Sequence, residues 1–175
     1  AFIGIINAKG SPFADRARVT RVWDEDPALA RAAANDGVKA VERLEDAIEG
    51  AGLVMICGRW ADEHPDLAVR VAGHAVPVFI DKPVAASHAR AMDVAEAFAK
   101  SGAPAFSASA YRYDPDVLDF VRNLPSLGAF RSGQAAGLSE WAGLGPKAME
   151  PYFYAVHTAE MIQAVFGTGM ESLTV

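Results

Sequence analysis

The sequence predicts an α/β fold of the Rossmann-like type, in which helices cover both faces of a doubly wound parallel sheet. Strand-like and helix-like segments alternate up to about residue 104 and are joined by short connections, as in repeated βαβ units. The continuous apolar run Leu53–Cys57 is typical of a parallel strand that is covered on both faces. After Pro104 the alternation loosens, which indicates the start of a second, α+β domain.

The first ten residues decide where the sheet begins. Phe2, Ile3 and Ile6 fall on one face of a helix, and Gly10 suits the left-handed residue at which such a helix stops. The alternative is a first strand followed by a poor glycine loop. We expect the helix, so the first strand of the sheet and its phosphate loop would lie upstream of residue 1.

The segments up to residue 52 repeat the order of strand and helix. Asp26 is expected to cap a helix that starts at Pro27, because an aspartate side chain accepts hydrogen bonds from the free N–H groups of the first turn. The stretch Gly50–Gly52 precedes a strand, whereas a phosphate loop must follow one, so a turn is expected there. The segments expected in this part are a strand at 18–23, a helix at 27–34, an extended piece near residue 38 and a helix at 43–48.

The rest of the chain is expected to divide into two domains, residues 1–104 and 105–175, the first incomplete at its N-terminus and the second at its C-terminus. The loop at 137–150 is long for a compact domain, which predicts a functional or interdomain segment. The segments expected after the strand at 53–57 are a loop at 58–64, helix 65–72, strand 77–80, a helix capped by Ser87 and ending at Lys100, strand 105–110, helix 115–124, strand 129–136, helix 151–166 and a strand that begins at 171.

The composition narrows the classes of function. The 175 residues are 51% hydrophobic and 22% charged, with a formal net charge of −6, as expected of a soluble globular protein. Basic residues are spaced singly, which favours neither nucleic acid nor an anionic membrane as a partner, and no apolar run reaches the roughly 18 residues of a membrane span. The single cysteine, Cys57, allows no internal disulfide and no cysteine-based metal site. We therefore expect no metal and a reducing, cytoplasmic location.

The first candidate for a binding residue is Asp24. It directly follows a strand early in the βαβ series, where a carboxylate of a dinucleotide-binding fold accepts hydrogen bonds from the adenosine ribose hydroxyls. The alternative is that Asp24 and Glu25 are turn residues ahead of a helix.

The ends of two later strands carry a stronger chemical signal. Asp81-Lys82-Pro83 closes one strand, and Cys57-Gly58-Arg59 closes the strand before it. Ligands of open α/β sheets bind at these carboxyl ends, and a proline holds the residue before it in an extended conformation. A lysine fixed there, together with His157 from a later helix, favours a reaction centre over a solvated turn.

These segments resemble the Gfo/Idh/MocA family of oxidoreductases, the relatives of glucose–fructose oxidoreductase and inositol dehydrogenase. Asp81-Lys82-Pro83 stands where that family has Glu-Lys-Pro at the end of the fifth strand. The other segments that carry the resemblance are Asp24, His64-Pro65-Asp66, the Tyr111–Pro115 segment that is similar to the entry into the second domain, and Phe153–Met161, which is similar to the helix that holds the family histidine.

The resemblance implies hydride transfer between a sugar or polyol carbon and the nicotinamide of NAD or NADP. Lys82 would orient the substrate oxygen and stabilise its negative charge, and His157 would accept or donate the proton, roles that suit an ammonium and an imidazole. NAD is favoured, because a carboxylate at Asp24 would repel a 2′-phosphate unless Arg21 or Arg59 lies close enough to offset it. The residues implied around the cofactor are Asp24, Cys57, Gly58, Arg59, His64, Asp81, Lys82, Pro83 and Arg112.

One departure from the family pattern concerns the surroundings of His157. Family members commonly carry an aspartate one helical turn earlier, and this sequence has Phe153 there. Tyr154 and Glu160, three residues before and after the histidine, lie near the same helix face. They are the candidates to replace the aspartate and to contact the substrate. His64 is expected to cap the following helix or to line the cofactor site.

Two other classes of function compete with the dehydrogenase. A nucleotide-binding sensor or interaction protein would keep the fold without catalysis; Phe153 and the absent glycine loop favour it, whereas Lys82 with His157 opposes it. A methyltransferase-like enzyme also places a strand-end acid on a ribose, but it gives no reason for Asp-Lys-Pro. His74 and His88 are expected at the surface. Besides a small-molecule substrate, the partner that the family implies is a second copy of the chain, bound through the sheet of the second domain.

Overall fold

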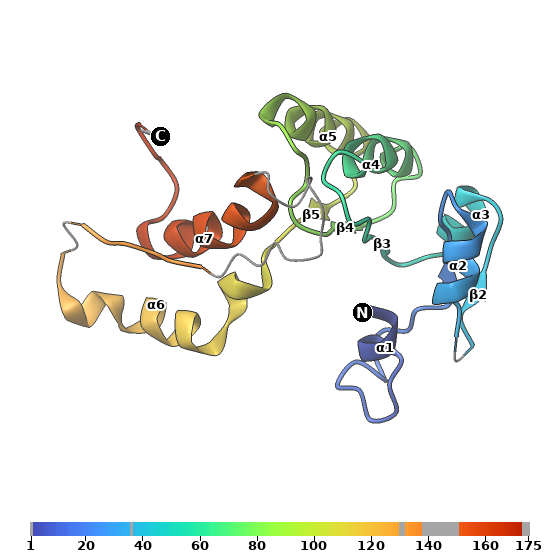
Figure 1. Ribbon diagram of the computed structural model, residues 1–175, viewed down its shortest axis with the longest axis horizontal. Helices are drawn as coiled ribbons and strands as arrows, with labels where there is room; N and C mark the ends of the chain where they lie inside the picture. Colours follow the sequence, from blue (N-terminus) through green and yellow to red (C-terminus); the bar gives the residue numbers. More distant parts are fainter. Residues whose placement is uncertain (1, 36, 130–131, 138–150, 173–175) are drawn as a thin grey trace. The chain divides into compact units, whose positions relative to one another are not determined.

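The computed structural model describes residues 2–35, 37–129, 132–137 and 151–172 (Figure 1). It divides between Gly52 and Leu53 into two compact units, each with a parallel sheet of its own. The parallel sheets and the helices between their strands agree with the predicted Rossmann-like α/β class. The predicted boundary between residues 104 and 105 stays a prediction.

The first unit, residues 1–52, pairs two short parallel strands with three helices. α1 forms where a helix is predicted, and Gly10 after it has a φ of 80°, so the helical interpretation of the first residues is confirmed. Asp26 caps α2 as predicted, since its carboxylate accepts the Ala28 N–H at 2.8 Å. The elements are α1 (Phe2–Ile6), β1 (Arg21–Val22), α2 (Pro27–Ala33), β2 (Lys39–Ala40) and α3 (Leu44–Ile48).

β1 is shorter than the predicted strand at 18–23, because only Arg21 and Val22 have partners in β2. The Arg21 guanidinium donates to the backbone carbonyls of Asp46 and Glu49 at the end of α3. A helix leaves its last carbonyls without partners of their own, so this contact ties β1 to α3. Arg21 therefore has a structural role within this unit.

The second unit, residues 53–175, contains a three-stranded parallel sheet in the order β3–β4–β5. Ile56 of β3 is level with Ile80 of β4, so both strands end at the same edge of the sheet. The elements are β3 (Val54–Ile56), α4 (His64–Ala72), β4 (Val78–Ile80), α5 (His88–Ser101), β5 (Ala105–Phe106), the 3₁₀ helix η1 (Ala110–Tyr113), α6 (Pro115–Leu127) and α7 (Pro151–Phe166).

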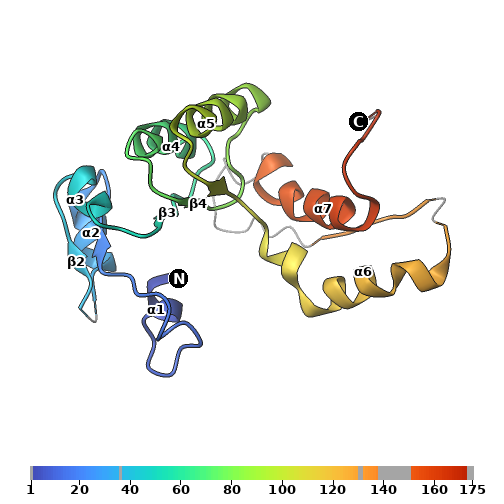
Figure 2. The same ribbon diagram turned by 180° about the vertical axis from the view of Figure 1, so that it is seen from behind.

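Helices α4 and α5 lie side by side over one face of this sheet (Figures 1 and 2). The Ser87 hydroxyl caps α5 and Gly102, at a φ of 72°, ends it, both as predicted. The buried apolar side chains between the helices and the sheet include Ala68, Val71, Val78, Ile80, Val94 and Phe98.

The prediction that the strand at 53–57 is covered on both faces is wrong for this structure. Only Ile56 of β3 is buried, and Leu53 is 46% exposed. On the next strands, the rings of Phe79 and Phe106 pack against each other at 5.1 Å, and Phe106 remains 57% exposed. The reason is that the helices α4 and α5 cover only one face of the sheet. Successive residues of a strand point to opposite faces, and Phe79 and Phe106 alternate with the residues that face these helices.

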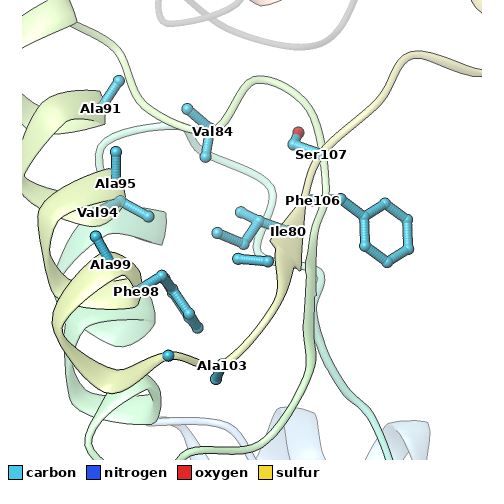
Figure 3. A pocket seen from close by; sticks show the side chains of 12 residues that line it. Ile80, Val84, Ala91, Val94, Ala95, Phe98, Ala99, Ala103, Phe106 and Ser107 are labelled. Carbon is cyan, nitrogen blue, oxygen red and sulfur yellow. The ribbon is translucent and has the colours of Figure 1, made fainter.

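A cavity of about 530 Å³ lies between α5 and the strands β4 and β5 (Figure 3). Ile80, Val94 and Phe98 point into it, and Phe106 points away from α5. Alanines of α5 and apolar strand residues form the rest of its wall, and neither Lys82 nor His157 lines it. This cavity is therefore separate from the candidate residues at the sheet edge.

The C-terminal helices follow the sequence closely, whereas the strands predicted beside them are shortened or do not form in the described part of the chain. α7 has the predicted bounds, and α6 continues three residues past the predicted Leu124. The predicted strand at 105–110 stops at Phe106, because η1 takes up the chain from Ala110. Residues 129, 132–136 and 171–172, predicted as strand, have no strand partner and no regular structure.

Three predictions fall partly on residues that the structure does not describe: residues 130–131 of the strand at 129–136, the loop at 137–150 from residue 138 onward, and the last three residues of the strand that begins at 171. Within the described ranges, no helix is both long enough and apolar enough to span a bilayer.

Candidate active site

The two predicted strand ends meet at one edge of the three-stranded sheet. Asp81-Lys82-Pro83 follows β4 and Cys57-Gly58-Arg59 follows β3. The Asp81 N–H donates to the Ile56 carbonyl at 2.8 Å, which continues the ladder past the last paired residues. Parallel strands present their carboxyl ends together, and this edge is where open α/β sheets bind ligands.

Lys82 reaches from the sheet edge to the first turns of α7. The Asp81 carboxylate accepts the Lys82 N–H at 2.9 Å and holds the turn, and the Lys82–Pro83 peptide bond is cis. The Lys82 ammonium donates to the Phe153 carbonyl at 3.3 Å. It also lies 5.0 Å from the ring centre of Phe153 and 5.5 Å from that of Tyr154, within the range of cation–π attraction.

His157 lies one turn further along α7 and is held by the residues around η1. Its Nδ1 is 2.6 Å from the Ser109 hydroxyl oxygen. The Tyr111 ring stacks on the imidazole with centroids 4.7 Å apart and planes at 27°. On the other side, the Tyr154 ring centre is 6.2 Å from that of His157. Tyr154 thus contacts both Lys82 and His157, so the structure brings the two predicted catalytic residues into one cluster.

The surroundings of this cluster lower the pKa of both groups. Burial lowers the pKa of Lys82 below its ordinary value of 10.5, and the Asp81 carboxylate opposes the shift only in part. Burial also lowers the pKa of His157 below 6.5, with a second contribution from the positive charge of Lys82. An imidazole of this kind is neutral at pH 7 and so is able to take a proton.

His64 joins the two strand ends instead of capping α4. The prediction of a cap is wrong: His64 is the first residue of α4, and its ring makes no cap bond. Its Nδ1 lies 2.8 Å from the Pro83 carbonyl and its Nε2 lies 2.8 Å from the Gly58 carbonyl, and the side chain is 99% buried (1% exposed). The imidazole is the right length to bridge two carbonyls that belong to neighbouring loops.

We predict that His64→Ala lowers the free energy of unfolding of the protein by about 2–4 kcal/mol, because a buried ring is removed together with its contacts to the Pro83 and Gly58 carbonyls. Urea unfolding followed by circular dichroism measures the change. His74→Ala is the matched control, since His74 is exposed, and it should change stability by no more than about 0.5 kcal/mol. Equal stability of the two variants would show that the bridge is dispensable.

The other residues of the β3 loop fit a binding role to different degrees. Gly58 is closely packed against His64, because a Cβ there would lie 3.3 Å from Cδ2 of that ring. Arg59 is exposed, and its guanidinium lies 5.5 Å from the ring centre of Trp60. Burial of the thiol, with a further contribution from Asp81, raises the pKa of Cys57 to about 12 although part of the residue is exposed. Cys57 is therefore a neutral thiol and not a nucleophile.

Neither predicted substitute for the missing aspartate bonds the imidazole. The Glu160 carboxylate accepts the backbone N–H of Ser109 at 2.9 Å. Tyr154 meets His157 only through its ring. Arg112, predicted near the cofactor, donates to the Gln163 side chain at 3.1 Å and so connects η1 with α7. Phe153 itself is buried and packs against Trp60 with ring centres 5.5 Å apart.

Asp24 lies in the first unit, between β1 and α2. Its carboxylate accepts the Asp26 N–H at 2.9 Å, which forms a turn ahead of α2, and the residue is exposed. This geometry is the one expected of a turn residue. Its second carboxylate oxygen stays available to a ligand, so the predicted ribose contact remains a prediction.

The sequence-based reasoning missed Ser109 and the ring of Tyr111 as partners of His157. Ser109 is fully buried at 0% exposure, and nothing in the sequence around it indicates this burial or its contact with His157. His74 and His88 are exposed, as predicted. Among the described residues, no group of three or more histidine, cysteine, aspartate or glutamate side chains is arranged to hold a metal ion.

Comparison with solved structures supports the same fold. An oxidoreductase from Bacillus cereus shares 20% identity at a TM-score of 0.64, over 87% of this chain and 47% of that one. The WlbA dehydrogenase from Chromobacterium violaceum, solved with NADH and UDP-GlcNAcA, shares 22% at 0.61, over 71% and 36%. A putative myo-inositol dehydrogenase from Sinorhizobium meliloti shares 26% at 0.57, over 71% and 36%. The chain thus spans less than half the length of these structures, and no curated protein matches it.

The Rossmann-like sheet carries a half-buried lysine, Lys82, at its edge, and His157 of α7 shares the aromatic neighbour Tyr154 with it. The sequence profile described as "Oxidoreductase family, NAD-binding Rossmann fold" matches residues 3–109, more than half of the chain. The chain belongs to this family, the Gfo/Idh/MocA oxidoreductases. The family resemblance and the expectation of a nicotinamide cofactor are therefore confirmed.

Proposed function

We propose that this protein transfers a hydride between a nicotinamide cofactor and a sugar or polyol, which is oxidised at a hydroxyl or reduced at a carbonyl. The observation that carries the proposal is that Lys82 and His157 both contact the Tyr154 ring, next to the carboxyl ends of β3 and β4. The putative myo-inositol dehydrogenase among the similar structures, at 26% identity, supports a polyol-type substrate.

The residues at the sheet edge fit a nicotinamide dinucleotide. Gly58 is exposed just after the end of β3, and a glycine lets a ligand approach the backbone closely. Gly58, Arg59, Asp81 and Pro83 are the residues of this unit that would hold it. When bound, the nicotinamide supplies or takes up the hydride.

The chain's own residues would handle the substrate oxygen. The Lys82 ammonium, held by the Phe153 carbonyl and two aromatic rings, would donate a hydrogen bond to that oxygen and stabilise its negative charge as the hydride leaves the carbon. His157 would accept the hydroxyl proton during oxidation and return it during reduction. Half-buried aromatic surroundings would limit the access of water to both groups.

Cofactor binding is tested by heat unfolding of the protein with NADH, NADPH or S-adenosylmethionine. A ligand that binds the native state at 100 times its dissociation constant stabilises it by about 2.7 kcal/mol, so NADH should raise the melting temperature by several degrees and S-adenosylmethionine should not. Protection by S-adenosylmethionine alone would overturn the proposal. Protection by NADH without NADH formation on any of a panel of sugars and polyols would leave a dinucleotide-binding sensor.

The choice between the cofactors depends on Asp24 in our proposal. The Asp24→Ser variant should narrow the preference for NADH over NADPH, because the carboxylate that repels a 2′-phosphate is gone. Glu25→Gln is the matched control, since Glu25 is the next exposed carboxylate along the chain, and it should leave the preference unchanged. The same preference in both variants would exclude Asp24 from the ribose site.

The alternative of a catalytically altered sensor keeps one specific observation in its favour. Phe153, one turn before His157, is a buried aromatic residue and offers no carboxylate to the imidazole. The geometry favours the enzyme, because a sensor has no need of an ammonium and an imidazole that share an aromatic neighbour.

A further inference from the structure

The partner of the His157 ring is a hydroxyl rather than a carboxylate, and the hydrogen bonds around that hydroxyl determine which ring nitrogen carries the proton. Ser109 is fully buried, and its oxygen accepts the Tyr111 N–H at 3.1 Å. The same oxygen lies 2.6 Å from Nδ1 of His157. A hydroxyl has one proton to donate, and a buried donor requires an acceptor.

Among the residues that the structure describes, His157 Nδ1 is the one acceptor within hydrogen-bond distance of the Ser109 hydroxyl. The hydroxyl therefore donates to Nδ1. In a neutral imidazole one nitrogen donates and the other accepts, so the proton of the ring is on Nε2. No protein group in the described part of the chain bonds Nε2, which leaves that N–H for a ligand.

We infer that Ser109 is the positioning residue of His157 and holds the resting ring in the tautomer that carries its proton on Nε2. The Tyr111 ring, stacked on the imidazole, fixes the ring plane, and the Glu160 carboxylate fixes the backbone of Ser109. Because a carboxylate only accepts, it would hold the proton on Nδ1. A hydroxyl can donate to an unprotonated Nδ1, and after rotation about its C–O bond it can accept from a protonated Nδ1.

This inference rests on the proposed function for its chemical meaning. The resting ring would donate a hydrogen bond from Nε2–H to a substrate oxygen, such as the carbonyl of an oxidised sugar, and would keep its proton. When the Ser109 hydroxyl turns and accepts from Nδ1–H, Nε2 would be free to take the proton of an alcohol. The imidazolium so formed would return this proton in the reverse reaction. A hydroxyl partner thus allows both tautomers of the neutral ring, whereas a carboxylate would hold only the second.

The tautomer is measured by two-bond ¹H–¹⁵N correlation on the protein labelled in its histidine rings, at pH 7.5 without cofactor or substrate. The His157 signals are assigned by their loss in His157→Gln. We expect a protonated Nε2 and an unprotonated Nδ1. The ¹⁵N chemical shifts of these two nitrogens should differ more than those of the exposed His74 and His88, whose tautomers exchange freely. A protonated Nδ1 in the wild-type protein would overturn the inference.

Three serine variants separate positioning from folding. Ser109→Ala should move the ¹⁵N chemical shifts of the His157 ring toward those of His74 and His88. Ser109→Thr, which keeps the hydroxyl, should restore the wild-type shifts. Ser101→Ala is the matched control, because the Ser101 hydroxyl oxygen also accepts a backbone N–H, from Ala103 at 3.2 Å; it should leave His157 unchanged. If Ser109→Ala does not fold, the wild-type and threonine spectra decide.

Turnover gives a second readout. Ser109→Ala should lower kcat between about 10- and 100-fold, the range found when the partner that orients a functional imidazole is removed, with little change in the KM for the cofactor. If the wild-type protein shows the expected ¹⁵N shifts but turns over no substrate, only the proposed function is refuted. An active protein whose Ser109→Ala variant keeps the wild-type nitrogen pattern would refute only the role of Ser109.

Discussion

Replacing Lys82 with methionine should lower kcat/KM for the best substrate of a sugar and polyol panel by about 10²- to 10⁴-fold. Methionine keeps the length and apolar character of the side chain but removes the ammonium, so the substrate oxygen loses the charge that stabilises it. The affinity for NADH, measured by fluorescence titration, should stay within about twofold, because the backbone of the Asp81-Lys82-Pro83 turn is unchanged.

Lys100→Met is the control for this variant. Lys100 is exposed on α5 and pairs with Glu96 at 2.9 Å, so its replacement should leave both turnover and NADH affinity unchanged. Equal losses in the two variants would mean that the effect comes from net charge alone. Undiminished turnover in Lys82→Met would remove Lys82 from the reaction.

Replacing His157 with glutamine should lower kcat by about 10²-fold or more, because the group that exchanges the proton with the substrate is lost. Its clearest signature is in the pH dependence. Since burial and Lys82 lower the pKa of His157 below 6.5, oxidation by the wild-type enzyme should fall only below that pH, as the imidazole becomes charged. It should fall again at high pH, through a Lys82 pKa that burial holds below 10.5.

In His157→Gln the acidic limb of the kcat/KM profile should disappear and the alkaline limb should remain, because the two limbs belong to different groups. His88→Gln, at an exposed histidine, should keep the full profile. An acidic limb that persists in His157→Gln would assign that titration to another residue.

Local patterns in the sequence were sufficient for the helices. Asp26 before Pro27 and Ser87 before α5 supply the side-chain caps that start their helices, and Gly102 supplies the left-handed residue that ends one. These signals act within a few residues, so they do not depend on the rest of the fold. For the same reason α7 has the bounds that its sequence predicts.

Strands were harder to place, because a strand exists only where another strand pairs with it. The run at 105–110 has strand-like composition, but β4 pairs with only Ala105 and Phe106 of it. Residues 132–136 find no partner among the described residues. Composition indicates that a segment is able to pair, and tertiary structure determines how far the pairing extends.

The sequence by itself determined the family, the sheet edge and the two residues that we expect to carry the reaction. Lys82 could be singled out because a proline follows it at a strand end, and His157 because of the helix around it. These are short-range patterns, and one chain is enough to show them.

The tertiary structure alone decided what surrounds those residues. The contact of His64 with Pro83 spans 19 residues, and the contact of Ser109 with His157 spans 48. Neither serine nor histidine carries a local mark of its distant partner. A hydrogen bond between segments so far apart depends on how the chain folds back, so only the folded structure could show that a hydroxyl orients the imidazole.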